Sequence, residues 1–103
     1  MDGTTEAKRA NIRTACLKAR EFMDFVLAAI GPYDIYPQSV WMGMPLSGKT
    51  YSAAVEFRGN LTDFIKLVAE INQRYPTCEW NGLGVRYEVC IKQGHSDSDD
   101  DSD

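Results

Sequence analysis

Residues 50–58 read TYSAAVEFR, and the structure of this short stretch decides the fold of the chain. Its apolar side chains recur at every second position, namely Tyr51, Ala53, Val55 and Phe57. An alternation of period two places such side chains on one face of a β-strand. We therefore predict a strand over 50–58, with its polar side chains on the opposite face.

The segment GMPLSGKT at 43–50 matches the phosphate-binding pattern G-x-x-x-x-G-K-[ST] at every fixed position. That pattern binds phosphate when a helix begins at the Lys-Thr pair, because the N–H groups of the loop and helix hold the anion. Here a predicted strand follows Thr50 instead. Pro45 and Gly48 suit a hairpin connection. We predict a turn, no cofactor, and nucleotide binding through 43–50 only as a minor alternative.

Two amphipathic helices are predicted on either side of this hairpin. Over 4–30, apolar side chains recur at three- and four-residue spacing, and Gly31-Pro32 ends the helix. Over 61–75 the same spacing follows Asn60, which is a favourable N-cap. Both helices therefore have one apolar face to bury.

The remaining segments predict a loop and further strands. Residues 31–38 are rich in turn-forming residues and are predicted as a loop, and a strand at 39–44 follows. A short third strand at 78–80 precedes an Asn-Gly turn, and alternation predicts the last strand at 85–92. The order is αββαββ. This predicts an α+β two-layer sandwich, with two helices on one face of a small, mostly antiparallel sheet of three to four strands.

The chain divides by charge into a neutral body and an acidic tail. It has 103 residues and a net charge of −4 from 11 basic and 15 acidic side chains. Five of the acidic side chains lie at the end of the chain, at Asp97, Asp99, Asp100, Asp101 and Asp103. Without them, ten acidic and eleven basic side chains remain. We predict one globular domain at 1–93 and a disordered acidic tail at 94–103.

The composition also indicates the cellular compartment in which the protein is expected. No apolar run approaches the ~20 residues that cross a bilayer, and no signal peptide is recognisable. Three cysteines without a C-x-x-C motif predict buried, reduced thiols rather than disulfides or a zinc site. We expect a cytoplasmic protein, or a nuclear one in a eukaryotic cell, that is neither secreted nor bound to a membrane.

No catalytic or metal-binding constellation emerges from the residue types. His95 lies where the predicted fold ends, without a patterned nucleophile or carboxylate beside it. Glu56 and Glu88 are on predicted outward faces, where solvated charges are expected rather than an acid–base pair. We therefore predict a non-enzymatic protein.

Two surfaces are the candidates for binding. The outward face of the sheet would present Trp41, Glu56, Arg58, Arg86, Glu88 and Lys92. On the first helix, Arg9, Arg13 and Arg20 fall within ~40° of one another at 100° per residue. This arginine stripe could contact phosphates or the acidic tail.

These features predict a protein-interaction module whose tail engages or masks basic surfaces. Small size and the lack of catalytic residues suit an accessory or inhibitory protein of a phage or other virus. The alternative is a nucleic-acid-binding module that uses the arginine stripe and the outward sheet face and is autoinhibited by the tail. An open sheet also allows pairing into a homodimer.

Overall fold

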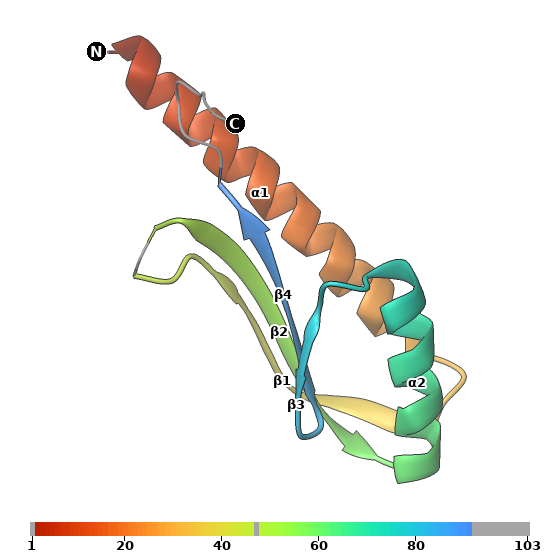
Figure 1. Ribbon diagram of the computed structural model, residues 1–103. Coiled ribbons are helices and arrows are strands. Elements are labelled where there is room, and N and C mark those ends of the chain that lie inside the picture. Colours follow the sequence, from red (N-terminus) through yellow and green to blue (C-terminus); the bar gives the residue numbers. More distant parts are fainter. Residues whose placement is uncertain (1, 47, 92–103) are drawn as a thin grey trace.

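The structure is a computed structural model that describes residues 2–46 and 48–91, with the side chains of residues 2–4 excepted. Its elements are α1 (Asp2–Ala29), β1 (Ile35–Gly43), β2 (Thr50–Gly59), α2 (Leu61–Arg74), β3 (Glu79–Asn81) and β4 (Gly84–Cys90). Figure 1 shows α1 running along one side of the sheet, with α2 near its C-terminal end.

The four strands form one antiparallel sheet in the order β1-β2-β4-β3. Helix α1 packs mainly on β2 and β4, and the side chains of α2 meet the same face of the sheet. The predicted α+β sandwich with two helices on one face of a small antiparallel sheet is confirmed. The short third strand also forms, one residue later than predicted.

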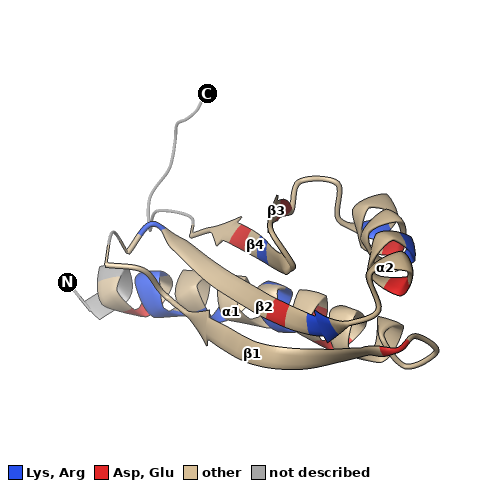
Figure 2. Cartoon of the chain, turned by 90° about the horizontal axis from the view of Figure 1, so that it is seen from below, with Lys and Arg blue, Asp and Glu red and all other residues tan. Residues whose placement is uncertain are grey.

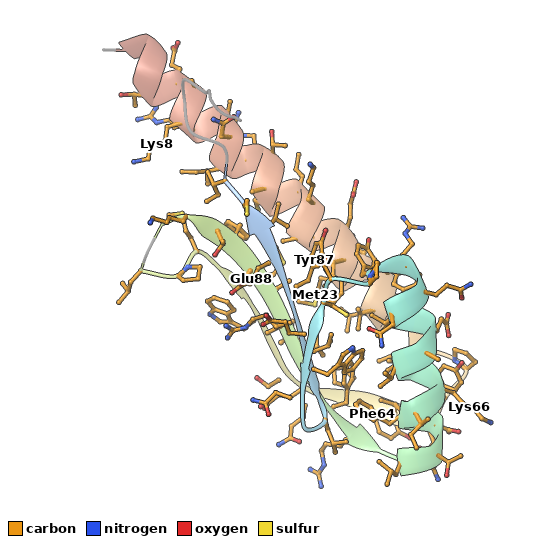
Figure 3. The ribbon with its side chains drawn as sticks, in the orientation of Figure 1. Lys8, Met23, Phe64, Lys66, Tyr87 and Glu88 are labelled. Atoms are coloured by element: carbon orange, nitrogen blue, oxygen red, sulfur yellow. The ribbon has the colours of Figure 1, made fainter. Side chains whose placement is uncertain are left out.

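The core lies between the helices and this face of the sheet. Its largest fully buried apolar side chains are Phe22 and Val26 from α1, Val55 from β2, and Leu67 and Ile71 from α2. The alternation in TYSAAVEFR therefore identified the buried face of β2 correctly. In Figure 3, Tyr87 and Met23 lie between β4 and α1, and Phe64 extends from α2 towards the sheet.

Backbone contacts join the start of β1 to the start of α2. Asn60 caps α2, because its Oδ1 accepts a hydrogen bond from the Asp63 N–H at 3.0 Å. The Asp63 carboxylate accepts from the Asp34 N–H at 2.9 Å, and the Asp34 carbonyl accepts from the Asn60 N–H at 2.8 Å. Gly59 precedes this junction with a φ of 136°. The junction holds the beginning of β1 in place.

The prediction of a loop throughout 31–38 is wrong for its second half. Strand β1 begins at Ile35, where Ile35 pairs with Gly59 and Tyr36 with Arg58. The register shifts between Pro37 and Ser39. Proline and a bulge are tolerated on an edge strand, because its outer side needs no ladder hydrogen bonds. The turn-forming residues therefore bend the strand without ending it.

The last strand ends earlier than predicted. Strand β4 stops at Cys90, and the Ile91 N–H donates to the Lys49 carbonyl at 2.9 Å. Lys92, His95 and the predicted tail at 94–103 lie outside the described residues. Neither α1 nor α2, within the part of the chain that the structure describes, has the length and apolar character to cross a membrane.

Candidate interaction surface

The segment GMPLSGKT forms the connection between β1 and β2. The two strands pair antiparallel, and Gly43 lies opposite Ser52. The Gly48 N–H donates to the Pro45 carbonyl at 2.9 Å, and Gly48 has a φ of 69°. Thr50 begins a strand rather than a helix. The predicted hairpin is confirmed, and the helix N-terminus of a phosphate-binding loop does not form.

The uncovered side of the sheet, here called the open face, brings together five of the six residues predicted for it. Trp41 lies in β1, Glu56 and Arg58 in β2, and Arg86 and Glu88 in β4. Trp41, Ala54 and Arg86 form one cross-strand row. The side chains of all five are exposed, and Figure 2 shows the charged positions along β2 and β4.

Tyr36 is an open-face residue that sequence reasoning missed. It pairs with Arg58, so the two side chains share a face, and 61% of Tyr36 is exposed. A hydrogen bond to Asp34 raises the pKa of its phenol. Because residues 31–38 were predicted as a loop, Tyr36 was not assigned to a face of the sheet. The only signal in the sequence was the alternation of Ile35 with Tyr36. The open face therefore has two exposed aromatic side chains, from Tyr36 and Trp41.

One end of the open face is held by polar contacts. Ser52 is fully buried although it lies on this side, and its hydroxyl donates to Glu88 Oε2 at 3.5 Å. The same Glu88 oxygen lies 3.7 Å from Nη1 of Arg86. The indole of Trp41 lies along its own strand, with Cζ2 3.0 Å from where a Cβ at Gly43 would stand. The polar contacts orient Glu88 and Arg86, and the missing side chain of Gly43 leaves room for the indole of Trp41.

A depression of ≈ 520 Å³ lies in the middle of the open face. Its floor includes the small residues Ala54 and Gly84, and its edges include Glu56, Glu79 and Arg86. With Arg58 and Glu88, the charged residues that the described strands place on this face are two arginines and three glutamates. The surface therefore has both signs of charge and a slight acidic excess.

The arginine stripe lies on the other side of the sheet. Arg9, Arg13 and Arg20 are all exposed on α1, the helix that covers the opposite face. Arg20 Nε lies 4.0 Å from an Asp24 carboxylate oxygen, an exposed pair of the kind that contributes little to stability. The arginine stripe therefore does not share a face with Trp41, Arg58 and Arg86.

The cysteines differ from the prediction in their burial. All three thiols are free, but Cys16 and Cys78 are half-buried and Cys90 is exposed. Asn72 Oδ1 accepts from the Cys78 thiol at 3.3 Å and from the Trp80 indole at 2.8 Å. Burial raises the pKa of Cys78. In residues 2–46 and 48–91, no cluster of three or more His, Cys, Asp or Glu side chains could hold a metal ion.

Comparison of the chain with protein-family models, curated proteins and solved structures found no match.

Proposed function

We propose that the protein is a non-enzymatic protein-interaction module that binds its partner through the open face of the sheet. The observation that supports this proposal is the set of side chains on that face. Tyr36, Trp41, Arg58 and Arg86 are of the residue types that contribute most to protein–protein binding. Arg86 also lines the depression, which a partner's side chain could enter.

The mixture of charges supports a protein partner more than a nucleic acid. Surfaces that stack bases surround their aromatic side chains with basic groups. On the open face the glutamates outnumber the arginines by one, so a polyanion would meet repulsion. A protein partner with charges of both signs can instead pair with this pattern.

Site-specific photocrosslinking tests the proposal. A photoreactive phenylalanine analogue at Arg86, in the middle of the open face, is expected to capture one partner in cells that make the protein. The same analogue at Ile65 is the matched control, because Ile65 is 62% exposed on α2, outside the sheet. Capture at neither position, or equal capture at both, would contradict the proposal.

Once the partner is captured, alanine substitutions measure how much individual open-face residues contribute to the binding affinity. Trp41→Ala and Arg86→Ala are each expected to weaken binding about tenfold or more, as loss of a central aromatic or arginine anchor does. Ile65→Ala should leave the affinity unchanged. Titration calorimetry with the purified partner measures all three variants.

The alternative function remains a nucleic-acid-binding module. It is favoured by the exposed Arg9 and Arg13, which flank Asn11 on α1. Cys90 at the end of β4 lines a small cavity together with Asn11 and Lys18 of α1. The twelve residues beyond Ile91 can span at most ~40 Å, which reaches the arginine stripe.

Oligonucleotide titrations separate the two functions. At physiological salt we expect no binding by residues 1–103 or by residues 1–95. Fluorescence anisotropy measures both forms, and Arg13→Glu is the matched charge variant. Binding that weakens with salt, strengthens without residues 96–103 and is lost in Arg13→Glu would instead establish the autoinhibited alternative. Amide spectra of the two forms would then show shifts around Arg9, Arg13 and Arg20.

A further inference from the structure

Strand β1 is an edge strand whose outer side meets no other strand in the described chain. It pairs only with β2, and α1 packs mainly on β2 and β4 (Figure 1). The opposite edge is β3, which has only three residues. A long edge strand presents a row of unpaired N–H and C=O groups to which another strand can pair.

The second half of β1 lacks the usual protection of an edge. Natural edge strands are blocked by charged side chains, prolines or bulges. Pro37 and the register shift before Ser39 protect only the first half of β1. From Ser39 to Gly43 each residue pairs regularly with β2, and no charged residue occurs between Asp34 and Lys49. Figure 2 accordingly shows β1 without charged positions.

This half of β1 exposes apolar side chains on both sides of the sheet. Val40 lies opposite the buried Val55, yet 51% of Val40 is exposed because α1 lies over the neighbouring strands. On the open face 43% of Trp41 is exposed. A second strand beside β1 would cover part of both side chains.

We propose that β1 pairs antiparallel with β1 of a second copy of this chain, so that two four-stranded sheets become one sheet of eight strands. A register centred on Trp41 pairs the whole regular segment Ser39–Gly43 with itself. Val40 then lies opposite Met42 of the second copy, and the two Trp41 side chains meet on the open face. The interface is isologous, so each pair occurs twice.

The chemistry of the strand favours an identical copy over a foreign strand. An uncharged edge offers no electrostatic selection among other proteins. An identical edge supplies matched apolar pairs without any contact between like charges. The register also leaves space for the indoles. Each Trp41 lies over Gly43 of its own chain, and in the second copy the residue opposite Gly43 is the small Ser39.

The dimer does not depend on the proposed function, but it would extend the same surface. Residues directly opposite each other in an antiparallel pair lie on the same face of the sheet. The open faces of the two copies would therefore form one continuous surface with two depressions. A partner with two binding segments would bind such a surface more tightly than a single open face.

Analytical ultracentrifugation of the purified full chain tests this proposal. The 11.6 kDa chain is expected to sediment at twice that mass as its concentration rises. Val40→Lys should weaken the dimer at least about tenfold, because each dimer loses two apolar pairs. Ile65→Lys is the matched control, since it places the same charge at an apolar position on α2 that is at least as exposed as Val40.

A monomer at every concentration would overturn the proposal and point to a strand of another protein. A dimer that Val40→Lys leaves intact would overturn it as well, because the interface would then lie elsewhere. Hydrogen exchange of the wild-type protein gives a test without substitutions. Backbone amides in Ser39–Gly43 that point away from β2 should become protected as concentration rises, whereas those of α2 should not change.

Discussion

Gly59→Ala is expected to destabilise the fold by about 3 kcal/mol or more, which lowers the melting temperature by roughly 12 °C or more. Gly59 has a φ of 136°, a conformation that residues with a Cβ rarely adopt. An added Cβ would also collide with the backbone carbonyl of Asp34 and would stand 2.9 Å from Ile35 Cα. Both obstacles are backbone atoms of the junction that begins β1, so they cannot simply rotate away.

Gly82→Ala is the matched control for this prediction. Gly82 also has a positive φ, 61°, but nothing lies within 4 Å of where its Cβ would be. We expect a cost of only about 1–2 kcal/mol from the left-handed backbone. Thermal unfolding followed by circular dichroism measures both variants. Equal losses would mean that the contact between Gly59 and Asp34 does not constrain the fold.

Phe22→Ala is expected to destabilise the protein by about 3–5 kcal/mol, which is a large part of the stability of a small domain. Phe22 is fully buried on α1 between the helices and the sheet. Its ring centroid lies 5.0 Å from that of Tyr75 and 4.9 Å from that of Tyr87. Its removal would leave a cavity where α1, β4 and the end of α2 meet.

Leu17→Ala provides the control in the same helix. Leu17 is 56% exposed, so its replacement should change the stability by less than about 0.5 kcal/mol. Urea unfolding compares the two variants, with the same dependence of the unfolding free energy on urea concentration fitted to both. If Phe22→Ala were as stable as Leu17→Ala, the aromatic cluster around Phe22 would not be the centre of the core.

Local sequence patterns predicted the elements and the buried faces of α1, β2 and β4, but not that of α2, where Leu61 and Ile65 are exposed and Leu67 is fully buried. Phe57 and Val85 lie on the buried face that alternation assigned to them. These predictions succeed because a period of two or 3.6 residues reports which side of an element is apolar. The same reasoning resolved GMPLSGKT, since the alternation after Thr50 favoured a strand over the helix that a phosphate site requires.

The local patterns failed where residue type and tertiary position disagree. Residues 35–38 contain a proline and a polar residue, which favour a loop, yet pairing with β2 makes them part of β1. Ser52 has the polarity of an exposed residue but is fully buried beside Glu88. Cys90 has the apolar character of a core residue but is exposed at the end of β4. The pairing of each strand with its neighbour, rather than residue type, determines where these three positions lie in the fold.

By itself the sequence determined the αββαββ order, the two-layer architecture and the hairpin at 43–50, because each depends on patterns within one element or on residues adjacent in the chain. Only the tertiary structure decided that β1 is a bare edge, that Tyr36 joins Trp41 on the open face, and that the arginine stripe lies across the sheet from Arg58 and Arg86. Those facts depend on strand order and on where α1 crosses the sheet. Both result from long-range packing, which the periodicity of a single segment does not encode.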